Sequence, residues 1–466
     1  MRLSRGKKLI PLALAVLVAA CSSSAATSTP APVTPTQAPQ ATVAPAPTPA
    51  PTPAPATCTT LTVWAMPGSF SDSTANQLIT SFENAHPGCV VNYQVQQWNG
   101  IVAKLTTALA SNNPPDVFEI GNTDAITFEA AGALADLTAS RAMLGGGTSN
   151  VSADPGQLWL ASLNDASVYN GKLFAVPFYA GDRILMYRKD LFKAANIDPA
   201  SITSKAKLIA AAQTLQTANK SVKDFSGLYL PGQNWYALMQ MIWDEGGQIA
   251  TQGSDGKWAG ALESANSEKG IQDYVDYFKA GSTGPANNDE ANPPQYTLFA
   301  QGKVGMMIAN GWEIGLSSGA NSVVKDASNI GVIPIPSVND GKTVPVFLGG
   351  SVIGIAKTSK NLPAALDFVA QLSQPQAENN MIGEGWIPNL KQFAANIPDT
   401  PANATLKIQA QEAAAGSGFT PNAVGWAAVE ANNPIKAMLT AILTGQMTVD
   451  QAAKDADTKI NAVING

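Results

Sequence analysis

The pattern of apolar and polar positions after residue 57 alternates short β-rich runs with longer helical ones. Residues 61–64, 90–95 and 116–120 are rich in β-branched and aromatic side chains and are predicted to be strands. Residues 74–84 and 101–109 lie between them and carry apolar side chains at helical spacing. Strand–helix–strand order of this kind predicts an α/β fold whose parallel strands present ligands at their carboxyl ends.

The same alternation continues to the end of the chain. Residues 206–217 and 237–243 are predicted to be helices, and residues 304–309 a strand. Thr448 and Gln451 fit a capping box at the start of a last helix. Residues 58–466 are more than a single hydrophobic core usually holds, so we expect two lobes.

The first twenty residues have the three parts of an export signal. Four basic residues at positions 2, 5, 7 and 8 precede an apolar run at 9–20. Twelve helical residues rise only about 18 Å, too little for a hydrocarbon core of roughly 30 Å, so residues 1–20 are predicted to be a cleavable signal peptide. The run Val18-Ala19-Ala20-Cys21 resembles a bacterial lipobox, which predicts a lipid on Cys21. The alternative is a cysteine inside an ordinary signal.

Residues 21–57 are expected to form a lipidated tether. Residues 22–57 contain only Ala, Pro, Thr, Ser, Val and Gln, with ten prolines in thirty-six residues. Such a segment cannot bury a core, and proline at this density favours extended polyproline II with a reach of ~100 Å at about 3.1 Å per residue.

Charge and cysteine content narrow the possible partners. The formal net charge is −6, and removal of the four leader bases makes it −10. An acidic body without a basic cluster argues against nucleic acid as a partner. With Cys21 assigned to lipid, Cys58 and Cys89 remain as a pair, and a disulfide outside the cytoplasm would stabilise by roughly 3 kcal/mol. Two buried thiols are the alternative.

Most catalytic and metal-binding signatures are missing. His86 is the single histidine, which excludes an H-E-x-x-H zinc motif. A phosphate-loop ending at 341–343 lacks its earlier glycine, and residues 349–353 miss the last position of a G-x-S-x-G elbow. We therefore expect no metal, no cofactor and no enzyme. A secreted glycosidase remains an alternative, because it needs only two carboxylates. The candidates are Glu119, Asp124, Asp182 and Glu313.

Tryptophans stand in polar loops, most of them beside glycine. They are Trp98, Trp235, Trp312, Trp386 and Trp426. A flat ring covers the C–H face of a sugar while neighbouring polar groups bind its hydroxyls. Each could instead be a packing anchor, but five in similar settings favour a carbohydrate site.

Several segments together resemble one family. The central stretch at 171–192 runs from Gly-Lys-Leu-Phe-Ala-Val-Pro-Phe-Tyr to Met-Tyr-Arg-Lys-Asp-Leu-Phe. It is similar to the signature of family 1 extracellular solute-binding proteins, the maltose-, trehalose- and chitobiose-type receptors of ABC importers. Residues 115–118, 299–307, 349–355 and 443–446 agree with the same family in the same order.

The resemblance implies a two-lobed periplasmic-binding-protein-like (type II) α/β fold with an interlobe hinge and a ligand cleft. The N-lobe is expected at 58–179 and 333–385, and the C-lobe at 180–332 and 386–466. Strands are expected to cross between the lobes near 179–182, 330–335 and 382–388.

The expected ligand-binding residues come from the resemblance and from the loop tryptophans together. The resemblance implies hydroxyl-binding loops in the first lobe and aromatic platforms in the second. Gly181 departs from the family, in which an acidic contact can stand there, so Asp182 or Arg183 is expected to take over. The full set is Ser69, Trp98, Thr123, Asp124, Asp182, Arg183, Trp235, Tyr236, Trp312, Glu313, Trp386 and Trp426.

These expectations combine into one function. The chain is predicted to be a monomeric, extracytoplasmic receptor, anchored to the bacterial membrane by lipid. It would capture a di- or oligosaccharide and deliver it to the permease of an ABC importer. The alternatives are the glycosidase and the same fold binding a non-sugar solute.

Overall fold

The computed structural model describes residues 58–466, which belong to one compact unit. The predicted signal peptide, the tether and Cys21 lie outside the described residues. Within the described part, no helix is both long and apolar enough to span a bilayer.

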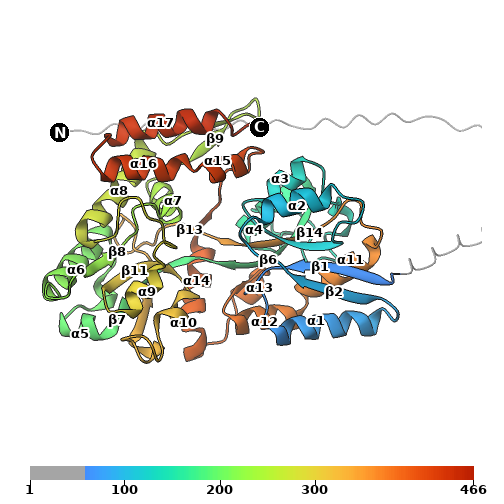
Figure 1. Cartoon of the computed structure of the whole chain (residues 1–466), viewed down its shortest axis with the longest axis horizontal. Helices are drawn as coiled ribbons and strands as arrows, with labels where there is room; N and C mark the ends of the chain where they lie inside the picture. Colours follow the sequence, from blue (N-terminus) through green and yellow to red (C-terminus); the bar gives the residue numbers. More distant parts are fainter. Residues whose placement is uncertain (1–57) are drawn as a thin grey trace, which may run out of the picture. The chain divides into compact units, whose positions relative to one another are not determined.

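The first lobe is built on a six-stranded sheet (Figure 1). Its order is β15 (Ile387–Pro388), β6 (Ala175–Gly181), β14 (Gly349–Ile355), β3 (Val117–Gly121), β1 (Thr60–Ala65) and β2 (Val90–Val95). β1 pairs in parallel with β2 and β3, whereas β14 runs antiparallel to β3 and β6. The mixed pairing allows strands distant in sequence to join one sheet.

Helix α1 of the first lobe buries the apolar face that the sequence pattern predicts. Ser71 caps α1 by accepting from the Thr74 amide, and Leu78 and Phe82 on its inner face are buried. The helices are α1 (Asp72–Ala85), α2 (Ile101–Leu109), α3 (Ala125–Ala130), α4 (Ala161–Asp165), α11 (Leu362–Ala370), α12 (Pro375–Glu384) and α13 (Lys391–Ala394). A small hairpin joins β4 (Val168–Tyr169) to β5 (Lys172–Leu173).

The second lobe is built on a four-stranded sheet. Its order is β12 (Ile330–Ile333), β7 (Arg183–Arg188), β11 (Val304–Asn310) and β8 (Ser226–Tyr229). Two further strands, β9 (Ala250–Gln252) and β10 (Trp258–Gly260), come between β8 and β11 in the sequence and form a separate two-stranded sheet. The helices are α5 (Lys189–Ala194), α6 (Lys205–Ala218), α7 (Trp235–Asp244), α8 (Ala265–Gly281), α9 (Gln295–Ala300), α10 (Glu313–Ser317), α15 (Trp426–Asn432), α16 (Pro434–Leu443) and α17 (Val449–Asn461). The predicted capping box at Thr448 and Gln451 is confirmed.

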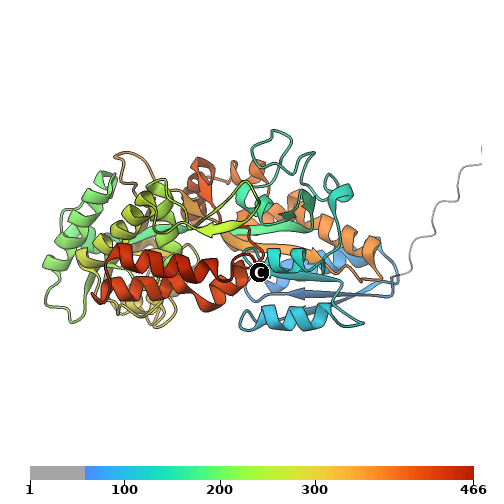
Figure 2. The same ribbon diagram turned by 90° about the horizontal axis from the view of Figure 1, so that it is seen from above.

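The two lobes lie side by side along the long axis of the molecule (Figure 2). Three segments of the chain run between them. The first is the junction of β6 and β7 at Asp182. The second leads from β12 through β13 (Val346–Phe347) into β14. The third contains α14 (Ala404–Ala415) and β16 (Ser417–Gly418), and β16 pairs in parallel with β13.

The pairing places two lobe boundaries later in the chain than we expected. β15 pairs with β6, so residues 387–388 belong to the first lobe's sheet rather than to the second lobe. Ile335 and Val344 are buried in the hydrophobic core of the second lobe, so the first lobe resumes only after them. Sheet pairing and core packing, which the linear pattern does not contain, set these boundaries.

The expected disulfide is present. Cys58 is bonded to Cys89, with 5.0 Å between their Cα atoms. The bond links the chain just before β1 to the chain just before β2. Because β1 and β2 are neighbouring parallel strands, it fixes the start of both.

Candidate functional site

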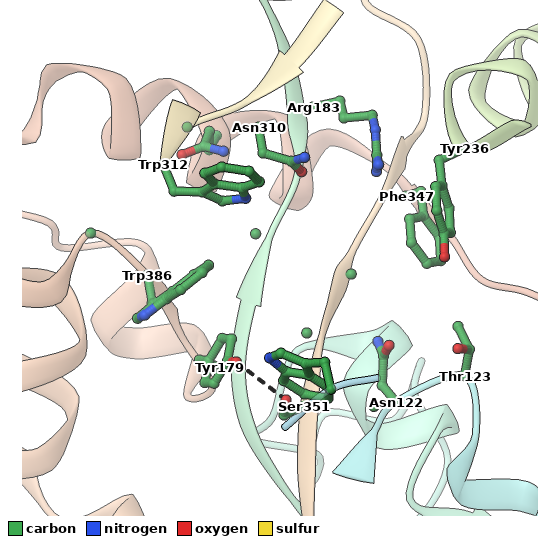
Figure 3. A pocket seen from close by; sticks show the side chains of 18 of the residues that line it. Asn122, Thr123, Tyr179, Arg183, Tyr236, Asn310, Trp312, Phe347, Ser351 and Trp386 are labelled. Carbon is green, nitrogen blue, oxygen red and sulfur yellow. Dashed lines mark hydrogen bonds between the residues drawn. The ribbon is translucent and has the colours of Figure 1, made fainter. Parts of the chain in front are cut away.

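A cavity of about 390 Å³ lies where the two sheets and the crossing segments meet (Figure 3). The loop after β3, at 121–124, forms its wall on the first lobe. Arg183 at the start of β7 and the turn at 310–312 after β11 contribute the second lobe. Both β3 and β11 therefore present their carboxyl ends to the cavity, as expected for an α/β sheet.

Trp386 is fixed in place beside the hinge. It follows Gly385, whose left-handed backbone (φ 85°) ends α12. Its ring lies 4.5 Å from the Tyr179 ring, centre to centre, and its Nε1 donates to the Gly68 carbonyl at 3.3 Å. A β-carbon at Gly181 would lie 3.5 Å from the indole, which is an ordinary van der Waals distance, so residue 181 lies directly beside the ring. The half-buried indole thus offers a pre-organised flat surface.

A second aromatic group comes from the other lobe. Tyr236 stacks on Phe347 at 5.2 Å between ring centres, and the Arg183 guanidinium lies 4.5 Å from the Tyr236 ring. Arg183 Nη2 also donates to Glu290 at 2.5 Å. The arginine is 5% exposed, so the ion pair and the ring together offset the cost of burying its charge.

Two more indoles line the cavity while remaining open to solvent. Trp98 is 41% and Trp312 is 49% exposed. Trp98 lies in the loop between β2 and α2, and Trp312 is the N-cap of α10. Large exposed rings lining a cavity are typical of platforms that a ligand covers.

Two carboxyl groups face the cavity without a basic partner. Burial raises the pKa of Asp124 to about 6. Burial and then the neighbouring charge of Asp124 raise the pKa of Glu430 to about 7. Glu430 accepts from Trp426 Nε1 at 2.9 Å and from Thr123 Oγ1 at 3.3 Å. Because Thr123 and Glu430 come from different lobes, this bond joins the lobes directly.

The floor of the cavity is tightly packed. A β-carbon at Gly350 would lie 2.1 Å from the Tyr179 carbonyl oxygen, so no side chain fits there. Ser351 Oγ donates to the Tyr179 hydroxyl at 3.3 Å. The strands β6 and β14 can approach at this point only because residue 350 is glycine.

Seven of the twelve expected ligand-binding residues line the cavity. They are Trp98, Thr123, Asp124, Arg183, Tyr236, Trp312 and Trp386. The structure brings them together from segments that are up to 288 residues apart in the sequence.

Three expected polar ligands lie outside the lining. Ser69 is fully buried behind the floor, where its Oγ donates to Glu119 at 2.7 Å. Asp182 is fully buried in the first crossing. Glu313 is 2% exposed, and its carboxylate accepts from the Asn310 amide and from Gln295, both at 2.9 Å. All three polar groups are therefore buried in the protein interior and do not line the cavity.

Two expected tryptophan platforms are core residues. Trp235 is 4% and Trp426 is 0% exposed, and both belong to the hydrophobic core of the second lobe. Each is the first residue of its helix, α7 or α15. Trp426 contributes to the cavity only indirectly, through its hydrogen bond to Glu430.

The sequence analysis did not select several lining residues. They are Asn122, Tyr179, Asn310, Phe347, Ser351, Gln409 and Glu430. Asn122 and Asn310 adjoin selected residues and could have been found from that position. Glu430, four residues after Trp426, lies one helical turn further on. Nothing in the sequence around Gln409 indicates its position, because α14 reaches the cavity only through the hinge.

Of the four carboxylates considered for glycoside hydrolysis, only Asp124 lines the cavity. Glu119 accepts from Ser69, Tyr179 and the Met66 amide, and burial raises its pKa. Within residues 58–466, no three His, Cys, Asp or Glu side chains come together in a group suited to a metal ion.

A cavity between two lobes that are joined by three crossing segments is the architecture of solute-binding receptors. Residues 68–379 match the model of the family described as bacterial extracellular solute-binding protein. The chain belongs to this family.

Curated relatives and solved structures agree with this assignment. The chain is 35% identical over 405 residues to the diacetylchitobiose binding protein DasA of Streptomyces coelicolor, covering 86% of this chain and 89% of that protein. It is 26% identical over 303 residues to a maltooligosaccharide ABC transporter solute-binding lipoprotein of Streptococcus pneumoniae, covering 63% and 66%.

Two solved structures share the fold. The sugar-binding protein MalE of Xanthomonas citri superposes with a TM-score of 0.71 at 20% identity, covering 87% of this chain and 97% of that one. The GacH receptor of Streptomyces glaucescens gives 0.69 at 24% identity, covering 87% and 98%. The two-lobed α/β fold is therefore confirmed.

Proposed function

We propose that this chain is an extracytoplasmic receptor that captures a di- or oligosaccharide and delivers it to the permease of an ABC importer. The observation that carries the proposal is the joint presence of aromatic rings and hydroxyl-binding groups around one cavity. Relatives named for diacetylchitobiose and for maltooligosaccharide transport support a carbohydrate as the ligand class.

The cavity suits a sugar in its chemistry. Trp98, Trp312 and Trp386 offer flat apolar surfaces for C–H faces. Asn122 and Asn310 offer amides, and the two carboxyl groups accept hydroxyl protons through charge-assisted bonds once ionised. A volume of about 390 Å³ lies in the range of small-ligand sites.

Capture requires the two lobes to act together. Lining residues come from both lobes, so a sugar that touches both favours the arrangement in which the lobes lie close. A ligand drives closure only by binding the closed state more tightly than the open one. The closed, loaded protein would then dock on the permease.

The remaining parts of the proposal concern location and state. A lipid on Cys21 and a tether over residues 21–57 would hold the receptor at the outer face of the cell membrane, as a monomer without catalytic activity. Mass spectrometry of the mature N-terminus tests the lipid. An unmodified cysteine, or cleavage at another position, would contradict it.

Calorimetry with a panel of disaccharides tests the ligand class. Diacetylchitobiose, cellobiose and maltose differ in linkage and substituents, and at least one is expected to bind with a Kd in the micromolar range or below, about −8 kcal/mol. Chromatography of the same mixtures after incubation separates receptor from glycosidase, because a receptor leaves the sugar intact.

Trp312→Ala tests whether the cavity is the ligand-binding site. Loss of the exposed indole is expected to cost roughly 1–3 kcal/mol of binding free energy, by analogy with aromatic anchors at other interfaces. An unchanged Kd would remove Trp312 from the site. If only a non-sugar solute binds, the proposed ligand class is wrong, although the fold assignment remains.

A further inference from the structure

Helix α14, which belongs to the third crossing segment, turns one face toward the hinge. Gln409 and Glu412 are three residues apart, so they lie on the same side of the helix. Both are buried, at 2% and 3% exposure. Together they contact each of the other two crossing segments.

Gln409 connects the hinge to the ligand cavity. Its Nε2 donates to the Asp182 carbonyl at 2.8 Å, in the first crossing. A β-carbon at Gly311 would lie 2.5 Å from Gln409 Oε1, so the turn that carries Trp312 rests directly on the amide. Gln409 also lines the cavity itself.

Glu412 holds the second crossing, and its charge acts on a second buried acid, Asp182, whose carbonyl accepts from the same face of α14. Its Oε1 accepts from the Ile335 amide at 3.3 Å. Its Oε2 has no hydrogen-bond partner, and neither carboxylate oxygen of Asp182 has one. Burial raises the pKa of Asp182 well above its usual value, and the charge of Glu412 raises it further.

The charged groups around the pair do not neutralise it. Arg183, the first residue of β7, lowers the pKa of Asp182 less than burial and Glu412 raise it. Its guanidinium forms its ion pair with Glu290 instead. Two buried carboxyl groups without a cation can remain buried together only if they keep at least one proton between them.

We propose that α14 is a proton-dependent clamp on the hinge, with Gln409 and Glu412 as its positioning residues. While the Asp182–Glu412 pair keeps a proton, the three crossing segments stay joined and the Trp312 turn stays in its ligand-binding position. Loss of the last proton places two charges in the hinge, which separates the crossing segments and opens the cleft. The effect on ligand affinity rests on the proposed function, whereas the effect on lobe arrangement does not.

The test compares pH profiles of three proteins. Affinity for whichever sugar binds is measured from pH 6 to pH 10 for the parent chain, for Glu412→Gln and for Glu378→Gln. Glutamine mimics the protonated acid. Glu378 is the matched control, because it is a fully buried acid on α12 whose pKa burial raises to about 8, and its carboxylate accepts from the Leu390 amide in the first lobe rather than from a crossing segment.

We expect the parent chain to lose affinity toward pH 10, by roughly tenfold for each unit of pKa difference between the closed and open states. Glu412→Gln is expected to bind equally well across this range, and Glu378→Gln to follow the parent. Asp124 and Glu430 titrate in the cleft in all three proteins, so the difference between profiles isolates the clamp. If Glu412→Gln does not fold, Asp182→Asn makes the same test.

Small-angle scattering of the ligand-free protein provides an independent readout. The radius of gyration of the folded parent is expected to increase toward pH 10, and that of Glu412→Gln to remain constant. A flat parent profile, or one that Glu412→Gln leaves unchanged, would overturn the clamp. If the scattering changes as expected but no sugar binds at any pH, the proposed function fails and the clamp stands.

Gln409→Leu tests the other half of the contact. It keeps the buried volume but removes the bond to the Asp182 carbonyl, so affinity is expected to fall about tenfold at every pH while the pH profile keeps its shape. Unchanged affinity would show that Gln409 does not position the Trp312 turn.

Discussion

Two groups of tryptophans with similar local sequences have opposite positions in this molecule. Trp98, Trp312 and Trp386 line the cavity, whereas Trp235 and Trp426 are buried in the second lobe. The cavity-lining indoles stand just outside regular helices, in a loop, at an N-cap or after a helix end. The buried ones are the first residues of helices whose apolar face turns them inward. A tryptophan's role thus depends on whether it stands outside a helix or on a helix face that packs against the core.

Among the variants that test this comparison, Trp426→Ala is expected to have the largest effect, a loss of stability. Removing a fully buried indole leaves a cavity and should lower the free energy of unfolding by about 3–5 kcal/mol. Urea denaturation measures the loss. Trp312→Ala, with its exposed ring, is the control and should change stability by less than 1 kcal/mol. Equal losses in both variants would contradict the distinction between core and cavity tryptophans.

Trp386→Ala should have its main effect on binding. The ring is held by Tyr179 and the Gly68 carbonyl, so its position is prepared before the ligand arrives. We expect about 1–3 kcal/mol of lost affinity, which calorimetry measures as a Kd increased roughly 5- to 150-fold. Trp258→Ala, a partly buried tryptophan on β10 outside the lining, should leave Kd unchanged. A larger effect from Trp258 would place the site elsewhere.

Trp98→Ala should weaken binding less than Trp386→Ala. Its ring is 41% exposed, so a cost of about 0.5–1.5 kcal/mol is expected. Titration with a short and a longer oligosaccharide of one series measures whether the ring acts mainly on the longer sugar. A loss equal to that of Trp386→Ala would mean that the two rings are equivalent.

The smallest effect should appear in the pH dependence of stability. The folded pKa values of Asp124 and Glu430 are raised to about 6 and about 7, so the folded state keeps protons that the unfolded state loses from about pH 4 upward. Their contribution to stability is therefore complete below pH 4 and is lost as pH rises to 7. Glu430→Gln should flatten this slope, because glutamine has no proton to lose in this pH range. An unchanged slope in urea denaturation would contradict the assignment.

Most of the elements could be predicted from local pattern. The helix at 101–109 was predicted with the observed bounds, and the strand expected at 304–309 extends to Asn310. Apolar periodicity and capping signals are properties of neighbouring residues, so a short window contains them. The two late boundaries, at 335–344 and 387–388, depend on pairing with distant strands, and no short window contains that.

The site was predictable mainly where the relevant residue occupies a loop or the first residues of a strand or helix. Thr123 and Asp124 follow a predicted strand and do line the cavity. Asp182 lies between β6 and β7 and Glu313 begins α10, but both side chains are buried in the protein. Their direction depends on tertiary packing, which the local sequence does not contain. Gln409 and Glu430 lie on helices, and their approach to the cavity follows from the packing of whole lobes.

The link between Cys58 and Cys89 also determines how the body responds to tension. A pull applied through the chain that precedes Cys58 enters the fold at the start of β1 and, through the disulfide, at the start of β2 as well. The load is then shared by two parallel strands in shear, so β1 cannot peel away alone from the sheet that carries the cavity wall. An oxidised receptor is thereby equipped to keep its ligand geometry while it is held by one end.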